Sequence, residues 1–321
     1  MGTLAHKIRR LAAALARHTP PFNRLLSEVA AARRTEPELA AARRAFRFAP
    51  PGHYYSPIPA VDEMSRDADR LFGQWPRELP GISLNVQRQL ALLSELSSYY
   101  PDLPFSRQRT AGCRYFFDNP MYPQSDAIFL YAMIRHLKPK RIVEIGSGYS
   151  SCVMLDTNEQ FLDNRVACTF VDPFPERLLS LLSTEDRSRV EIIPKRLQDI
   201  EVAWFRELDA NDILFIDSSH VLKLGSDVHY LVSEVLPALR IGVHVHLHDV
   251  FYPFEYPRAW IDEGRYWTEA YVLRAFLAFN SAFEIVLFNT YLQHFYREQF
   301  VQHMPLCLER DGGSIWIRRT A

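Results

Sequence analysis

Cysteine is scarce in this chain, and none of it is placed for a disulfide framework or a zinc site. The sequence holds four cysteines, which are scattered and lack any paired metal-ligand spacing: Cys113, Cys152, Cys168 and Cys307. Such usage is typical of a reducing compartment, so we expect a cytoplasmic protein.

The chain also lacks an excess of charge of either sign and any long apolar run. Lysine and arginine total 37 against 38 aspartates and glutamates. With so balanced a charge, nothing global favours a nucleic-acid partner. No run approaches the length of a membrane-spanning helix, and no signal-peptide pattern opens the chain. We therefore expect no nucleic-acid partner and no membrane span.

The N-terminal third differs in composition from the rest. We expect residues 1–120 to form a helical extension and residues 121–321 to form the main domain. Apolar residues recur at helical spacing near the start, among basic side chains: Leu4, Ile8, Leu11 and Leu15. Such a helix could lie on a membrane surface, but docking on its own protein or on a partner copy is favoured. A homo-oligomer through this region is therefore expected, and a second helix is expected from Glu38 to Phe46.

A proline-rich segment, residues 50–59, follows these helices. Its prolines and Gly52 exclude regular structure, yet it carries aromatic side chains with hydrogen-bonding groups, Tyr54 and Tyr55 among them. Two roles stay open. The segment could be a lid that brings both tyrosines to a substrate, or it could pack the extension onto the main domain.

The stretch from Arg141 to Ser151 is the most informative. An apolar run that ends at Ile145 predicts a buried strand, Gly146 and Gly148 predict a tight turn, and a helix can begin at Tyr149. Glycines at such a turn let the backbone approach a ligand closely, beside the free N–H groups of a helix start. The acidic Glu144, two residues before the first glycine, would repel a pyrophosphate but could hold a cationic amino-acid moiety.

This motif resembles the first motif of class I S-adenosylmethionine-dependent methyltransferases, and later segments match that family in order and spacing. The resemblance covers about the C-terminal two-thirds of the chain. It implies an α/β, Rossmann-like sheet of seven strands, mostly parallel with the last strand antiparallel, behind an N-terminal helical extension. It also implies S-adenosylmethionine as cofactor, bound at the turn by the following residues: Glu144, Gly146, Ser147, Gly148, Tyr149 and Ser150.

Apolar patterns place the remaining elements of the main domain. We expect strands over residues 167–171, 190–193, 212–217, 242–249, 283–288 and 314–318, and helices over residues 83–99, 127–137, 228–239 and 268–279. Ser125 or Asp126 can cap the helix that begins at Ala127.

Further cofactor contacts follow from the family pattern. Asp172 ends the second strand, where an acidic residue accepts hydrogen bonds from the ribose hydroxyls. Gln198 and Asp199 stand where related enzymes surround the adenine ring. Asp217, at the end of the fourth strand, faces the ligand-binding edge of an open α/β sheet.

The candidate metal ligands and the candidate catalytic base lie at the ends of two strands. Asp217 with His220, and His248 with Asp249, resemble metal-dependent small-molecule O-methyltransferases, including antibiotic sugar O-methyltransferases. Those enzymes place an acid after the fourth strand and an acidic pair after the fifth, around a divalent cation. The resemblance implies Asp217, His248 and Asp249 as metal ligands, and we expect His220 to be the catalytic base.

The chain departs from that pattern at His248, where the comparison has an acid. Imidazole suits Mn, Fe or Zn better than Mg, so the choice among Mg, Mn and Fe stays open. His248 and Asp249 can both reach one ion only if the chain bends after the strand. His244 and His246, inside the same strand, are interpreted as core histidines.

We therefore predict an S-adenosylmethionine-dependent methyltransferase that acts, with a metal ion, on a hydroxyl of a small natural-product substrate, polyhydroxylated or glycosylated. Tyr252 and Tyr256 leave the fifth strand towards the same mouth and could contact that substrate, or could simply pack. The alternatives are Fe-dependent redox chemistry at the same site, a nicotinamide-dependent oxidoreductase, and a non-catalytic partner subunit. Glu144 and the last two strands speak against the oxidoreductase.

Overall fold

The computed structural model describes residues 40, 44 and 47–321. The basic helix expected near residues 4–15 and its oligomer contact lie outside the described residues, as does most of the helix expected from Glu38 to Phe46. The chain divides into two compact units, Met1–Ala68 and Asp69–Ala321. That division falls well before residue 120, and the domain boundary expected there stays a prediction.

The described part of the first unit is mostly turns. It contains the helix α3 (Val61–Arg66) and the proline-rich segment. Within that segment the rings of His53 and Tyr54 stack with centroids 4.2 Å apart. Tyr54 is 81% exposed and Tyr55 is 62% exposed, and their expected contact with a substrate stays a prediction.

The second unit is built on one sheet. Among the described residues its strands are β1 (Arg141–Ile145), β2 (Ala167–Val171), β3 (Glu191–Ile193), β4 (Ile213–Ile216), β5 (His244–His248), β6 (Phe283–Phe288) and β7 (Ser314–Arg319). They form a seven-stranded sheet in the order β3-β2-β1-β4-β5-β7-β6. β7 pairs antiparallel with both β5 and β6, while the β1–β2, β2–β3, β1–β4 and β4–β5 pairs are parallel. The expected sheet, with its antiparallel last strand, is confirmed.

The central strands are buried because both of their faces are covered. All residues of β4 and β5 are buried, as is β1 after its first residue. Parallel pairing aligns Ile145 with Ile216, so β1 and β4 end together at one edge of the sheet. The residues that follow these strand ends are thereby brought to one place, as is usual in open α/β sheets.

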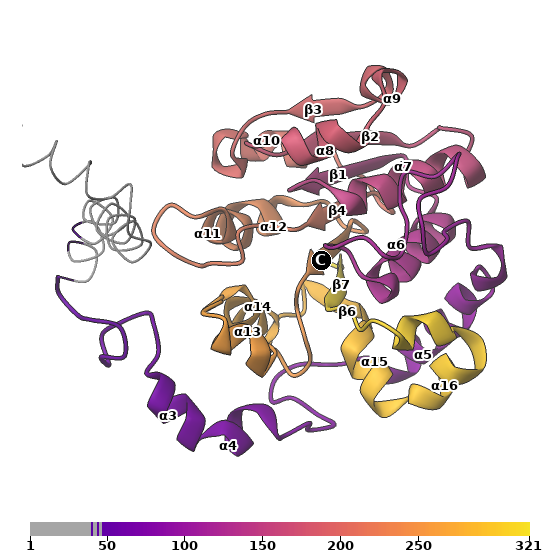
Figure 1. The fold of residues 1–321 in the computed structure, drawn as a ribbon. Helices are drawn as coiled ribbons and strands as arrows, with labels where there is room; N and C mark the ends of the chain where they lie inside the picture. The colour runs from indigo at the N-terminus through magenta and orange to yellow at the C-terminus, as the bar shows by residue number, and fades with distance from the viewer. Residues whose placement is uncertain (1–39, 41–43, 45–46) are drawn as a thin grey trace, which may run out of the picture. The chain divides into compact units, whose positions relative to one another are not determined.

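Helices of the second unit pack on the sheet in two groups. In Figure 1, α6 and α7 lie to one side of the central strands, and α11 and α12 lie to the other. The helices are α4 (Ala68–Phe72, which begins at the unit boundary), α5 (Val86–Ser97), α6 (Gln124–Leu137), α7 (Tyr149–Phe161), α8 (Glu176–Leu181), α9 (Thr184–Arg189), α10 (Val202–Phe205), α11 (Asp227–Tyr230), α12 (Leu236–Ala238), α13 (Arg258–Asp262), α14 (Glu269–Leu277), α15 (Asn289–Phe295) and α16 (Arg297–His303). A π-helical turn, η3 (Leu231–Val235), joins α11 to α12. Short 3₁₀ turns are η1 (Tyr100–Asp102), η2 (Leu197–Asp199) and η4 (Pro305–Leu308).

No helix in the described part of the chain is long and apolar enough to cross a membrane.

The expected cap of α6 is wrong. The helix begins at Gln124 behind Pro123 and has no side-chain cap. Asp126 is fully buried and faces the C-terminal strands, where its carboxylate accepts hydrogen bonds from Asn289 Nδ2 at 2.8 Å and Ser314 Oγ at 2.9 Å. The carboxylate therefore fastens α6 to α15 and β7 instead of closing its own helix.

Candidate active site

The glycine turn brings β1 into contact with the end of β4. Gly146 has φ +82°, and a Cβ there would lie 2.1 Å from the carbonyl oxygen of Asp217. Only glycine fits, because both the left-handed backbone and the space exclude a side chain. A Cβ at Gly148 would instead meet only the side chain of Arg177, at 3.2 Å. Gly148 thus leaves its space open towards the cavity beyond the turn.

Glu144 supports the turn from inside. Its side chain is fully buried, and its carboxyl oxygens accept hydrogen bonds from Ser150 and Ser151 at the start of α7. Burial raises the pKa of Glu144 to about 8, although the hydrogen bonds from the two serines lower it. The carboxyl group orders the helix start without lining the cavity, and its direct contact with the cofactor stays a prediction.

Asp172 faces the turn from the end of β2. One carboxylate oxygen accepts a hydrogen bond from Ser147 Oγ at 2.7 Å, and the other accepts one from the Phe174 backbone N–H at 2.8 Å. Gln198 also lines the cavity, whereas Asp199 is paired with Arg196 at 2.7 Å and does not. The adenine contact expected from Asp199 stays a prediction that this pairing does not favour.

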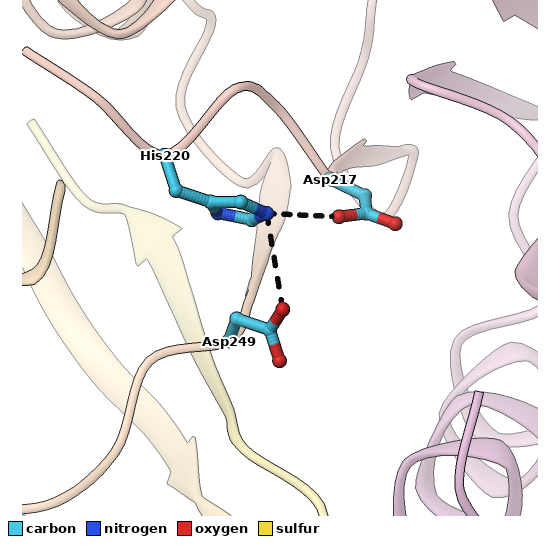
Figure 2. Close-up of side chains that lie close together, drawn as sticks. All are labelled: Asp217, His220 and Asp249. Atoms are coloured by element: carbon cyan, nitrogen blue, oxygen red, sulfur yellow. Dashed lines mark ion pairs between the residues drawn. The ribbon is translucent and has the colours of Figure 1, made fainter. Parts of the chain in front are cut away.

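Three side chains meet where β4 and β5 end. His220 Nε2 lies 3.2 Å from Asp217 Oδ1 and 3.8 Å from Asp249 Oδ2 (Figure 2). One ligand atom from each of the three residues lies within 4.8 Å of the other two. His220 and Asp249 have positive φ angles of 58° and 56°, so the chain does bend after β5. Backbone conformations of this kind cluster at functional sites.

The charged groups of this cluster stabilise one another. Burial alone would lower the pKa of His220, but hydrogen bonds and charge from Asp217 and Glu269 raise it well above its usual range. Burial alone would raise the pKa of Asp217, but the neighbouring imidazoles outweigh burial and lower it. Each group thus favours the charged form of its partner, and His220 is held between carboxylates.

Glu269, which the sequence did not single out, holds His220 from behind. Its Oε2 lies 2.8 Å from His220 Nδ1, and its Oε1 accepts a hydrogen bond from Ser218 Oγ at 3.0 Å. The side chain is almost fully buried, with 1% exposed. The ring of Trp267 stacks on the imidazole at 4.3 Å, so only Nε2 is directed at the two aspartates.

His248 lies beside the cluster without joining it. Its Nε2 is 3.5 Å from Asp249 Oδ1, and its Nδ1 is 3.8 Å from Asp126 Oδ2. Burial alone would lower the pKa of His248, but the carboxylates of Asp249, Asp217 and Asp126 raise it. The geometric cluster thus contains His220, where the sequence placed His248 as a ligand. Neither the metal-binding role expected for His248 nor the base role expected for His220 is tested by this geometry alone.

The other two histidines of β5 are buried, as expected. His246 is fully buried, its ring stacks on Phe215 at 4.1 Å, and burial holds its pKa well below the usual range. His244 has 4% of its surface exposed, and burial lowers its pKa to about 4. Both are uncharged core residues.

One cavity of about 1230 Å³ contains the glycine turn and the acidic cluster together. It is larger than the roughly 300–1,000 Å³ of a site for one drug-sized ligand. The expected site residues that line it are Gly146, Ser147, Gly148, Tyr149, Ser150, Asp172, Gln198, Asp217, His220, His248 and Asp249.

The outer wall of the cavity is aromatic. Trp260 meets Trp267 edge-on at 5.2 Å, and the guanidinium of Arg265 lies 4.9 Å above the Trp260 ring. Tyr252 and Tyr256, expected to contact substrate, are each only 1% exposed and do not line the cavity. They are structural in this fold: the Tyr252 hydroxyl donates to a backbone carbonyl, and the Tyr256 hydroxyl accepts from a backbone N–H. Their substrate role stays a prediction that their burial does not favour.

Comparisons with known proteins agree with this fold. A family model described as a methyltransferase domain matches residues 143–250. A protein of Archaeoglobus fulgidus, described only as uncharacterized, is 34% identical over 174 residues, which cover 53% of this chain and 78% of that protein.

Solved structures of similar fold include two methyltransferases. The S-adenosylhomocysteine-bound methyltransferase PaMTH1 of Podospora anserina has a TM-score of 0.40 and 14% identity, over 81% of this chain and 97% of that one. The O-methyltransferase TomG of Streptomyces achromogenes, in complex with S-adenosylmethionine, has a TM-score of 0.42 and 18% identity, over 72% and 90%.

Nothing among these relatives supports the oxidoreductase or the iron-redox alternative. The family match spans the glycine turn and both strand ends that build the acidic cluster. The seven-stranded sheet with an antiparallel last strand, expected from the resemblance, is that of the structure. Residues 143–250 therefore carry a methyltransferase domain, in agreement with the class I S-adenosylmethionine-dependent methyltransferase that the sequence predicts.

Proposed function

We propose that this methyltransferase transfers the methyl group of S-adenosylmethionine to a hydroxyl oxygen of a small molecule, with a divalent cation between Asp217 and Asp249. The observation that carries the proposal is that one cavity joins the glycine turn to the acidic cluster and is large enough for two ligands. A hydroxyl bound at the cluster would thus face a cofactor bound at the turn.

The residues present fit both groups. Gly148 leaves the turn open, and Asp172 offers a carboxylate that can accept hydrogen bonds from ribose hydroxyls. Asp217 and Asp249 supply oxygen ligands of the kind that hard divalent cations prefer. When bound, S-adenosylmethionine supplies an activated methyl group, and the cation would lower the pKa of the acceptor hydroxyl.

The protein's part is alignment and exclusion of water. Asp217 and Asp249, where β4 and β5 end, would hold the acceptor oxygen at a fixed position relative to a cofactor at the glycine turn. The two reactants would then react as an oriented pair within one site and not through a chance encounter in solution. Trp260 and Trp267 line the cavity and provide aromatic surface that suits the ring of a planar or sugar-like acceptor. A polyhydroxylated or glycosylated small molecule is therefore the proposed substrate class.

The test combines calorimetry with a methyl-transfer assay. We expect S-adenosylmethionine to bind and its labelled methyl group to reach hydroxylated acceptors in a panel of catechols and glycosides, with loss of transfer in chelator. Asp217→Asn should lower the rate on the order of a hundredfold or more. Asp209→Asn, an exposed acid paired with Arg240, is the matched control and should not change it.

Two results would contradict the proposal. Full activity of the wild-type enzyme after chelator treatment would remove the cation from the reaction. Transfer to amine acceptors with none to hydroxyls would assign the enzyme to a different acceptor atom.

A further inference from the structure

Two histidines stand near the proposed cation, and the structure distinguishes them. His220 Nε2 shares one space with Asp217 Oδ1 and Asp249 Oδ2, at 3.2 and 3.8 Å. Donors that each bind one cation at about 2.1 Å lie roughly 3 to 4 Å apart, so these separations suit a shared ion. His248 approaches only the other oxygen of Asp249, at 3.5 Å, and stands outside the cluster.

Neighbouring side chains hold the His220 ring in a tautomer and an orientation that suit metal binding. An imidazole that binds a metal through Nε2 must carry its proton on Nδ1, and a carboxylate at Nδ1 fixes that tautomer. Glu269 Oε2 occupies this position at 2.8 Å. Trp267 stacks on one face of the ring, which limits its rotation.

Backbone hydrogen bonds from the start of α14 hold the loop that carries His220 in place. The N–H groups of Thr268 and Glu269 both donate to the carbonyl oxygen of His220, at 2.9 and 3.1 Å. Thr268 Oγ1 accepts from the Leu222 N–H at 2.7 Å. The loop that carries His220 and the helix that carries Glu269 therefore form one connected unit, and Figure 2 shows the imidazole nitrogen directed between the two aspartates.

We infer that His220 is a ligand of the cation, positioned by Glu269, and that the site selects a first-row transition-metal ion such as Mn²⁺ over Mg²⁺. The inference rests on the proposed function and deepens it, since it moves to His220 the ligand role that was expected for His248. A nitrogen donor with two carboxylates favours the ions from Mn²⁺ to Zn²⁺, whereas Mg²⁺ binds oxygen ligands and water. Glu269 acts through His220 and is a positioning residue.

The experiment measures metal affinity without turnover. Wild type and variants are stripped with chelator, then titrated with Mn²⁺ and with Mg²⁺ by calorimetry. The main variant is His220→Asn, because asparagine tolerates the left-handed backbone at φ 58° and offers an oxygen in place of nitrogen. It should reduce the preference for Mn²⁺ over Mg²⁺ about tenfold or more. His248→Asn is the matched variant and should keep that preference.

Glu269 is tested by its neutral isostere. Glu269→Gln should weaken Mn²⁺ binding about 10- to 100-fold, as is typical when the partner of a metal-ligating histidine is lost. Mg²⁺ affinity should change much less, which a purely structural defect would not explain. Ser218→Ala removes the hydrogen bond to Glu269 and the one that Ser218 Oγ accepts from the His220 backbone N–H at 3.2 Å. It keeps the carboxylate at Nδ1, so its Mn²⁺ affinity should stay close to wild type.

The outcomes separate this inference from the proposed function. Unchanged ion preference in His220→Asn, with loss in His248→Asn, would restore the ligand set expected from the sequence and overturn the inference, while leaving methyl transfer in place. A wild type that binds S-adenosylmethionine but neither ion would overturn the inference and the metal part of the function together. Thermal unfolding of each variant identifies any variant that fails to fold. If His220→Asn fails to fold, the comparison of Ser218→Ala with Glu269→Gln still decides whether His220 is a ligand.

Discussion

Gly146 and Gly148 belong to the same turn but have different physical tasks. A side chain at Gly146 would collide with the backbone of Asp217, so this glycine is required for the fold itself. A side chain at Gly148 would displace only the flexible Arg177, so this glycine is free to serve a ligand. The sequence alone gives both the same role, since each is simply a glycine after a buried strand.

We predict that the two glycines respond differently to alanine. Gly148→Ala should weaken S-adenosylmethionine binding about tenfold, or 1.4 kcal/mol, with little loss of stability, because its Cβ enters the ligand space. Gly146→Ala should lower stability by at least about 2 kcal/mol, since it adds a left-handed alanine and a backbone clash. Calorimetry and thermal unfolding on both variants check this, and equal stability in the two would refute the distinction. Gly146→Val is unsuitable as a test of cofactor binding, because the same backbone clash would disturb folding.

Elements of the second unit are joined by buried charges as well as by apolar contacts. Arg114, in the segment that leads to α6, pairs with Asp156 of α7 at 2.7 Å and with Asp186 of α9. Asp126 connects α6 to β7 and α15. These contacts place α6 and its preceding segment against the cavity, which Met121 and Tyr122 line.

Removal of the Asp126 carboxylate should destabilise the fold. Asp126→Ala leaves Asn289 Nδ2, the Ser314 hydroxyl and the Gly313 N–H without their acceptor in a buried place. Each such loss costs about 1–3 kcal/mol, so we expect about 3 kcal/mol or more in total. Asp126→Asn keeps an acceptor and should cost less. Urea unfolding of both variants measures the difference, and a cost for Asp126→Ala below about 1 kcal/mol would contradict the anchoring role.

The Arg114–Asp186 pair predicts a pH dependence of stability. Burial alone would raise the pKa of Asp186, but the hydrogen bond from Arg114 and those at Ser183 lower it to about 2 in the folded protein. The folded pKa is thus below the unfolded value of about 3.8, so the pair stabilises the protein above pH 4 and loses its effect as the pH falls through 2.

The variant Asp186→Asn has no carboxyl group that could titrate at this position. The stability difference between wild type and Asp186→Asn should be about 1 kcal/mol near pH 6, less than the full shift implies because solvent screens the pair. It should shrink towards zero between pH 4 and 2, as measured by denaturant unfolding along a pH series. A difference that stays constant over that range would show that Asp186 does not titrate as described.

At the scale of the whole molecule, cofactor binding should be coupled to stability. The cavity is lined by residues that follow β1, β2, β4 and β5 and by residues that precede α6 and β7, so a ligand there bridges most of the sheet. A ligand that binds only the folded state at a hundred times its Kd stabilises it by about 2.7 kcal/mol.

We therefore predict that S-adenosylmethionine raises the Tm by about 5 to 10 °C at such a concentration. NADH at the same concentration should leave the Tm unchanged, and Asp172→Ala should remove most of the shift because it lacks the carboxylate proposed to bind the ribose. Differential scanning fluorimetry is sufficient for this comparison. An equal shift with NADH would reopen the dinucleotide alternative.

The sequence by itself determined the sheet and the positions of its ligand-facing ends. Local patterns sufficed, because an apolar run followed by glycine or aspartate marks a buried strand and its end wherever the chain folds. That is why β2 and β6 begin and end where expected, and why Asp172 and Asp217 were found.

Only the tertiary structure decided which side chains meet. Glu269 reaches His220 across 49 positions in the sequence because α14 docks on the loop after β4. Asp126, an ordinary cap in sequence, turns inward because Gly312 has no side chain in the space that the carboxylate occupies. No periodicity records such partners, since they depend on how separate elements pack. The same packing buried Tyr252 and Tyr256, and it brought His220 into the cluster in the place expected for His248.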